Sequence, residues 1–412
     1  MTTSRASRLV RNRFARVAVL TALAAGSAIA PVHAQGAASS QAWLGAVRAH
    51  APGAIDEAVV TVSRWPPGVA LAMVRKGVRE TTDPAVLQRA LVLHTDAAIA
   101  ERAAFEAGRR VRPGRGSRLL VDARAVGGEL PRSPHWDIGR EIAAALVTRP
   151  GGRAMVQRWY RASGALLQQW ADCVALREHL VAALRVLPDD PVLLLYDATL
   201  HQTYADPRVQ RFLRPSSDLP YEPSTGIGAR RDAQGFERDA DFADRRRAFA
   251  EGQVGIAADE LGRAEKALRR VIELDASLVE ARIRLAHVLV ARGQPADARP
   301  LAEAALASPL PPFLEYYAAM VLGWSADAQQ RPDDARRAFD RAATVFPLAQ
   351  SARIAISRHA LEGSHAADGL AAIVASSGPK AARDAGDPWW SYFRVHEPDS
   401  KTLLAALRGQ AP

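Results

Sequence analysis

Few residues in this chain have the types and spacing that metal or nucleophilic chemistry needs. His94 and Asp96 form a His-x-Asp pair, and both side-chain types are metal ligands. Side chains two residues apart on one helix point in different directions, however, and no third ligand accompanies this pair. Glu178 and His179 lie within a helical pattern, where a structural role is expected. The chain also lacks the motifs of zinc proteases, serine hydrolases and phosphate-binding loops, so we predict no catalytic residue, no metal and no cofactor.

The remaining reactive residue types do not change this prediction. Cys173 is the single cysteine, which excludes an intramolecular disulfide, and its apolar neighbours in QQWADCVALREHL indicate a buried, unreactive thiol. His359 and His365 flank an expected helix break and are too isolated to suggest a metal site. We therefore predict that the protein is not an enzyme. An open alternative is an active site split between the N-terminal half and residues 109–136.

The elements that must position any functional residue are helices, and the clearest pattern runs from Val279 to Pro347. This stretch contains the same two-helix unit twice, with small residues on one face of each second helix. The first copy contains Leu285, Ala286, a break at Gly293, Ala298, Ala302 and Ala305, and the second contains Leu322, Gly323, Ala335, Phe339, Ala342 and the terminating Pro347. Small residues at these places allow close approach of two helices, and Phe339 is expected to fill the space that they leave.

This pattern resembles the tetratricopeptide repeat, a helix–turn–helix unit of about 34 residues. Ala264, Leu268 and Val271 repeat the stripe upstream, and a weaker copy precedes Pro188. The resemblance implies an all-α fold, an α-solenoid of stacked helix–turn–helix hairpins. The composition agrees with it, because aromatic residues make up only 6% of the chain and alanine, which favours helices, is abundant.

The composition along the chain predicts its division into parts. These are a signal peptide at 1–34, an N-terminal helical region at 35–213 with an Arg-rich loop at 109–136, a linker or long loop at 214–244, a repeat array at 245–383 and a capping tail at 384–412. The loop contains Arg109, Arg110, Arg112, Arg115 and Arg118. Guanidinium groups suit carboxylate or phosphate, so an anion-binding patch and a solvated loop are both open interpretations.

Residues 1–34 have the pattern of an export signal: a basic start, an apolar run over Val17–Ala30 and small residues before a predicted cleavage after Ala34. We therefore expect a periplasmic or secreted protein, with a retained membrane anchor as the alternative. The leader holds five arginines and no acidic residue, so cleavage lowers the net charge from +10 to +5. That mild excess does not indicate a nucleic-acid partner.

The tail is rich in aromatic residues and ends in an amphipathic stripe of leucines. The aromatic residues are Trp389, Trp390, Tyr392 and Phe393, and the leucines are Leu403, Leu404 and Leu407. A helical array needs its last apolar face covered, so we expect the tail to cap the last repeat. An aromatic platform for a ligand is the alternative. The Asp-Pro-Trp-Trp segment is also similar to tails of other exported bacterial repeat proteins.

The resemblance implies that the opening helix of each repeat lines a groove for a protein or peptide partner. Carried onto this chain, the groove residues are Arg158, Arg161, Arg246, Phe249, His287, Tyr317, Trp324 and Asp327. Aromatic and arginine side chains contribute strongly at such surfaces, although Phe249 and Trp324 are also candidates for the core. We therefore expect a non-enzymatic binding or scaffold protein of the cell envelope. The alternative is a glycan- or envelope-polymer-binding protein that uses the tail aromatics and the Arg-rich loop.

Overall fold

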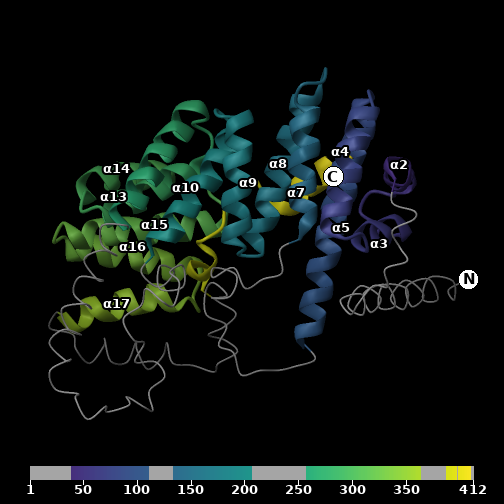
Figure 1. The fold of residues 1–412 in the computed structure, drawn as a ribbon. Coiled ribbons are helices and arrows are strands. Elements are labelled where there is room, and N and C mark those ends of the chain that lie inside the picture. The colour runs from purple at the N-terminus through teal and green to yellow at the C-terminus, as the bar shows by residue number, and fades with distance from the viewer. Residues whose placement is uncertain (1–38, 111–132, 207–256, 363–386, 397, 410–412) are drawn as a thin grey trace, which may run out of the picture.

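The described part of the chain is built from helices, and no residue within it belongs to a β-strand (Figure 1). The computed structural model describes residues 39–110, 133–206, 257–362, 387–396 and 398–409. The predicted signal peptide at 1–34 and linker at 214–244 lie outside these ranges. The predicted fold class, an all-α solenoid of stacked helical hairpins, is confirmed.

The N-terminal part packs its helices around one hydrophobic core. Its helices are α2 (Ser40–Ala49), α3 (Glu57–Ser63), α4 (Pro67–Glu80), α5 (Pro84–Arg110), α7 (Pro134–Leu146), α8 (Gly152–Gln169), α9 (Cys173–Val186) and α10 (Pro191–Ala205). Several begin with proline, whose missing N–H costs nothing in a first turn. Helix α10 also has an acidic cap, because Asp190 accepts hydrogen bonds from the N–H groups of Val192 and Leu193.

The Arg-rich segment begins inside a helix. Helix α5 continues to Arg110, so Arg109 and Arg110 belong to its last turn, and α7 begins at Pro134 behind the cap Ser133. Arg112, Arg115 and Arg118 lie outside the described residues, and the anion-binding interpretation of this segment stays a prediction.

The repeat array follows as stacked hairpins. It contains a helix at 257–274 and then α13 (Val279–Ala291), α14 (Pro295–Leu306), α15 (Pro312–Ala328), α16 (Pro332–Val345) and α17 (Gln350–Glu362). Gly293, with φ of 74°, makes the turn between α13 and α14. The predicted stripe of small residues on α14 and α16 is buried, and the opening helices α13 and α15 contact each other. This packing leaves α13 and α15 to form one continuous face.

Helix α10 joins the N-terminal part to the array. One set of its residues, including Tyr196 and Leu200, belongs to the N-terminal core. Leu195 and Ala198 belong instead to the core of the array, and α10 also contacts α13. Residues 133–206 are therefore continuous with the array, because one helix is buried on both sides.

Gly323 on α15 is needed for the close approach of α16. A Cβ atom at this position would lie 2.3 Å from the ring of Phe339, which is itself 1% exposed. We expect Gly323→Ala to lower the free energy of unfolding by about 1–3 kcal/mol, because the ring must leave its packed position. Urea denaturation measures this. Gly262→Ala is the control: a Cβ there meets nothing within 4 Å, so we expect a gain of about 0.5–1 kcal/mol. Equal effects of the two substitutions would contradict the packing.

His201 makes the joint between α10 and the array dependent on pH. Burial lowers its pKa, but the hydrogen bonds that the ring donates to Asp197 and Glu260 outweigh burial and raise the pKa to about 9. A raised pKa stabilises the folded state fully below about pH 6.5, and this contribution disappears as the pH rises towards 9. We expect His201→Gln to destabilise the protein at pH 6 by up to about 3 kcal/mol and to have little effect at pH 9.5. Urea unfolding at both pH values measures this, and a loss independent of pH would contradict it.

Candidate peptide-binding surface

The candidate site is built around a buried ion pair on the opening helix α13. Arg284 donates from Nε and Nη2 to Glu280 Oε1, at 2.9 and 2.6 Å. The two residues are one helical turn apart and their side chains are 1% and 2% exposed. A buried ion pair needs further hydrogen bonds for its remaining polar atoms. In this protein the C-terminal tail supplies several of them.

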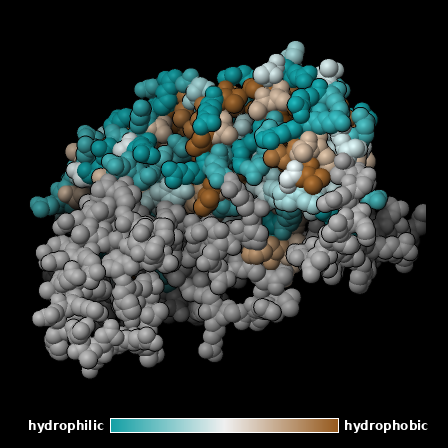
Figure 2. Space-filling model, in the orientation of Figure 1, coloured by the Kyte–Doolittle hydropathy of each residue, from teal (hydrophilic) through white to brown (hydrophobic). Residues whose placement is uncertain are grey.

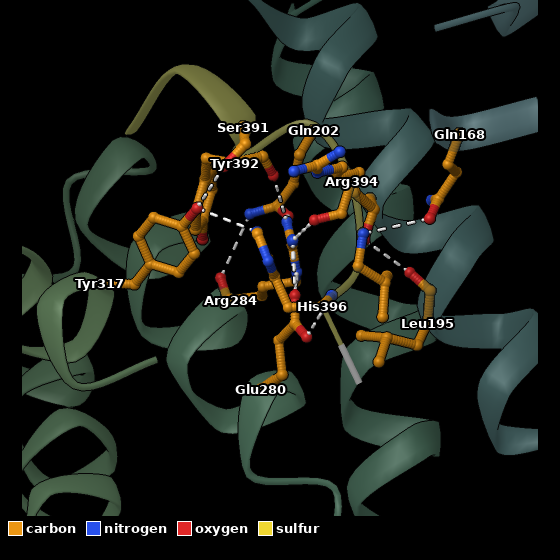
Figure 3. Close-up of polar contacts among 12 residues, drawn as sticks. Gln168, Leu195, Gln202, Glu280, Arg284, Tyr317, Ser391, Tyr392, Arg394 and His396 are labelled. Carbon is orange, nitrogen blue, oxygen red and sulfur yellow. Dashed lines mark hydrogen bonds and ion pairs between the residues drawn. The ribbon is translucent and has the colours of Figure 1, made fainter. Parts of the chain in front are cut away.

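The tail crosses the face of the array as an irregular segment around the short 3-10 helix η4 (Pro388–Ser391). Its main chain forms hydrogen bonds with the remaining polar atoms of the ion pair (Figure 3). Arg284 donates to the carbonyl oxygens of Tyr392, at 2.9 Å, and Arg394, at 2.6 Å. Glu280 Oε2 accepts from the N–H of His396 at 2.9 Å, and Gln168 Oε1 on α8 accepts from that of Val395 at 3.1 Å. Side chains of α8 and α13 therefore form hydrogen bonds with both the carbonyl and the N–H groups of the tail.

Aromatic rings fill the space beside this backbone contact. Trp389 and Tyr392 of the tail stack with centroids 4.3 Å apart, and the guanidinium of Arg284 lies 4.4 Å from the centroid of Tyr392. On the array side, Trp324 contacts Trp389 and His287 contacts both tail rings. These packed rings do not favour the glycan-binding alternative, since sugar binding needs an open aromatic face.

Tyr317 of α15 holds the start of the tail. Its hydroxyl donates to the carbonyl oxygen of Pro388 at 2.7 Å and lies 2.9 Å from His396 Nε2. The neighbouring Asp387 accepts hydrogen bonds from Tyr316 and from the backbone and hydroxyl of Ser351 at the start of α17. Gln202 of α10 accepts a hydrogen bond from Arg284 at 3.2 Å. We define the tail-binding surface as Gln168, Gln202, Glu280, Arg284, His287, Tyr317 and Trp324.

The far end of the tail is fastened to the N-terminal part. Leu407 of helix α20 (Ser400–Leu407) belongs to the N-terminal core, and Arg408 pairs with Asp96 of α5. Asp96 Oδ2 also accepts from the Gly53 N–H at 2.7 Å and lies 3.0 Å from His50. Burial lowers the pKa of His50, but its hydrogen bonds to Asp96 and Asp56 outweigh burial and raise that pKa above its ordinary value. The tail therefore spans both parts of the molecule.

Two histidines at the seam between tail and array are neutral near pH 7. Burial, with the nearby charge of Arg284, lowers the pKa of His287 to about 4. Burial also lowers the pKa of His396 to about 4; Glu280 opposes this, and Arg284 and Arg394 add to it. Protonation of either ring would place a positive charge beside Arg284.

The structure brings together part of the predicted groove. His287, Tyr317 and Trp324 meet beneath the tail. Arg161 instead pairs with Asp190, the cap of α10, while Arg158 is exposed on α8 and Asp327 is half-buried on α15. Arg246 and Phe249 lie outside the described residues. As residues that bind a partner, all eight stay predictions.

Arg284 is the functional candidate that the sequence analysis did not name. An arginine within a helical pattern is normally assigned to the solvent side. One signal was present: Glu280 and Arg284 are four residues apart, the spacing of an ion pair, on a helix expected to face the groove. Nothing in that spacing indicates that the pair is buried under the tail.

The residues considered for metal or nucleophilic chemistry have structural partners. Trp43 Nε1 donates to His94 Nε2, so the proton of neutral His94 is on Nδ1 and points to His135 Nδ1 at 2.9 Å. Asp96 belongs to the separate network with Arg408. Burial raises the pKa of the Cys173 thiol to about 12, and burial, with the nearby Arg140, lowers that of His179 to about 3. Within the described ranges no group of three metal-ligating side chains occurs.

Comparison with known proteins finds distant likeness of fold. No family model matches the chain, and no curated protein matches it. One similar solved structure is MamA 41-end from Desulfovibrio magneticus RS-1, with 16% identity and a TM-score of 0.34 over 56% of this chain and 97% of that one. Another is the TPR domain of P58(IPK), with 14% identity and a TM-score of 0.21 over 76% of this chain and 95% of that one. Likeness at this level assigns neither a family nor a function.

Proposed function

We propose that this chain is a non-enzymatic scaffold protein of the cell envelope whose tail-binding surface binds an extended polypeptide segment of a partner. The observation that carries the proposal is the hydrogen bonding of Arg284 and Glu280 to the main chain of the tail. Carbonyl and N–H groups are common to every polypeptide. A surface that pairs with them in the tail has the chemistry to pair with them in another chain.

The aromatic residues of the surface supply selectivity for side chains. His287, Tyr317 and Trp324 surround the rings of Trp389 and Tyr392. Buried aromatic and arginine contacts contribute most of the binding energy at protein interfaces. The backbone contacts therefore bind a segment in extended form, and the aromatic contacts select one that carries large rings.

The envelope location is supported by the pattern of residues 1–34. A basic start, a short apolar run and small residues before Ala34 are the features of a cleaved export signal. In the described part of the chain, no helix combines the length and apolar character needed to cross a membrane. The processed protein would then meet its partners beyond the inner membrane. N-terminal sequencing of the protein recovered from the envelope tests this, and an intact Met1 would contradict cleavage.

Capture from an envelope extract tests the binding function. The baits are the wild-type protein, Tyr317→Ala/Trp324→Ala and, as a milder change, Tyr317→Phe, which removes only the hydroxyl. Arg336→Ala/Arg337→Ala on the exposed face of α16 is the matched control. We expect a partner captured equally by the wild type and the control, with at least a tenfold loss for the first variant. Equal capture by all folded baits would exclude the tail-binding surface.

A further inference from the structure

The tail is an imperfect ligand for the surface that it covers. Gln168 is 3% exposed and its Oε1 accepts from Val395, but no acceptor among the described residues reaches its Nε2. His287 Nδ1 is buried without a hydrogen-bond partner in the same part of the chain. Buried polar groups are nearly always paired. Two unpaired nitrogens along one seam indicate that this surface has binding capacity that the tail does not use.

The gap beside Gln168 can be assigned to a position in the tail. The unpaired Nε2 belongs to the same amide whose oxygen bonds to Val395, so the nitrogen lies next to that residue. Val395 packs against both hydrophobic cores and offers only methyl groups. Threonine has the shape of valine with one hydroxyl oxygen, so it is the smallest change that brings a side-chain acceptor to this position of the tail.

We propose that residues 387–396 are a displaceable intramolecular ligand, and that in their place the tail-binding surface takes a segment of a different protein with the same chemistry. This rests on the proposed function and defines its partner. The segment begins with Asp-Pro, carries Trp and Tyr three residues apart, and has a hydrogen-bond acceptor three residues after the Tyr. Each feature matches a contact of the tail: Asp387 with Tyr316 and Ser351, the ring pair with Arg284 and His287, and Val395 with Gln168.

The attachment of the tail to the same chain makes it a strong competitor. A tethered ligand acts at an effective concentration in the millimolar range, so a free segment must bind more tightly than the tail or meet a loosened tail. The tail contacts therefore regulate access. A partner with an acceptor opposite Gln168 gains one buried hydrogen bond, which corresponds to a gain in affinity of roughly three- to tenfold over the sequence of the tail.

Fluorescence anisotropy with labelled synthetic peptides tests this proposal. The probe has the sequence of residues 387–396, and a second peptide carries Val395→Thr. The proteins are the full chain in its wild-type form and the full chain with Trp389→Ala/Tyr392→Ala, which loosens the tail and leaves the surface intact. We expect the variant to bind the probe at least tenfold more tightly than the wild type does, and the threonine peptide to bind a further three- to tenfold more tightly.

The controls separate this inference from the proposed function. A peptide with alanine in place of both rings must not bind, and circular dichroism must show that the variant is folded; if it is not, Trp389→Leu replaces it. Equal binding to wild type and folded variant, or no binding to either, would overturn displacement by a tail-like segment. If sedimentation shows that the wild type is a dimer, the partner is a second copy of this chain, and the proposal of a different protein is wrong. If the wild type still captures a partner from envelope extract but does not bind the tail peptide, the proposed function holds and displacement of the tail does not.

Discussion

Arg284→Met is expected to lower the free energy of unfolding by about 3–5 kcal/mol, one of the largest effects of a single change in this protein. The substitution leaves Glu280 charged and buried, and it removes the donor from the carbonyl oxygens of Tyr392 and Arg394. Methionine has similar length and no branch, so the cavity left behind is small. Urea denaturation followed by circular dichroism gives the change.

A matched exposed pair provides the control. Arg336 and Asp340 on α16 have the same i, i+4 spacing, but their side chains are 50% and 52% exposed. We expect Arg336→Met to change stability by less than about 1 kcal/mol. Glu280→Gln/Arg284→Met should lose less than the single substitution, because no charge then stays buried without a partner. Similar losses for Arg284→Met and Arg336→Met would mean that the pair is not buried in solution.

Acidification from pH 7 to pH 5 is expected to destabilise the seam between tail and array by about 4 kcal/mol. His287 and His396 each have a pKa lowered to about 4, against an ordinary value of 6.5. A lowered histidine pKa stabilises the folded state above pH 6.5, and this contribution is lost as the pH falls towards 4, because the unfolded chain takes up the proton first. Each histidine contributes about 2 kcal/mol to the drop.

His287→Leu isolates this effect from other titrating groups. The variant should be less stable at pH 7, but its drop between pH 7 and pH 5 should be smaller than that of the wild type by about 2 kcal/mol. His201 and His50, whose pKa values are raised, contribute with opposite sign and cancel in the comparison. Urea unfolding at the two pH values measures both drops. Equal drops in wild type and variant would show that His287 is accessible to protons in the folded protein.

The position of the tail links stability to binding in this protein. The tail supplies Trp389 and Tyr392 to the surface of the array, and Leu407 to the core of the N-terminal part. A partner that replaces residues 387–396 would therefore also weaken the connection between Arg408 and Asp96. Conditions that loosen the seam, such as acid, would increase access to the tail-binding surface.

The repeat array could be predicted from the sequence because its signals act over short distances. Alanines at helical spacing predicted which faces of α14 and α16 are buried, and Gly293 predicted the turn before α14. Proline in first turns and acidic caps mark helix starts in the same way. These effects involve residues within a few positions of one another, so their outcome is visible in the order of residues alone.

Only the tertiary structure determines that the C-terminal tail covers the opening helices α13 and α15. Arg284 contacts Tyr392 across 108 positions and Arg408 reaches Asp96 across 312. No periodicity connects such residues, because their meeting depends on the path of the whole chain between them. The sequence identified His287, Tyr317 and Trp324 as residues of one face. That this face holds the protein's own tail through the buried pair of Glu280 and Arg284 follows only from burial and long-range hydrogen bonds, which exist once the chain has folded.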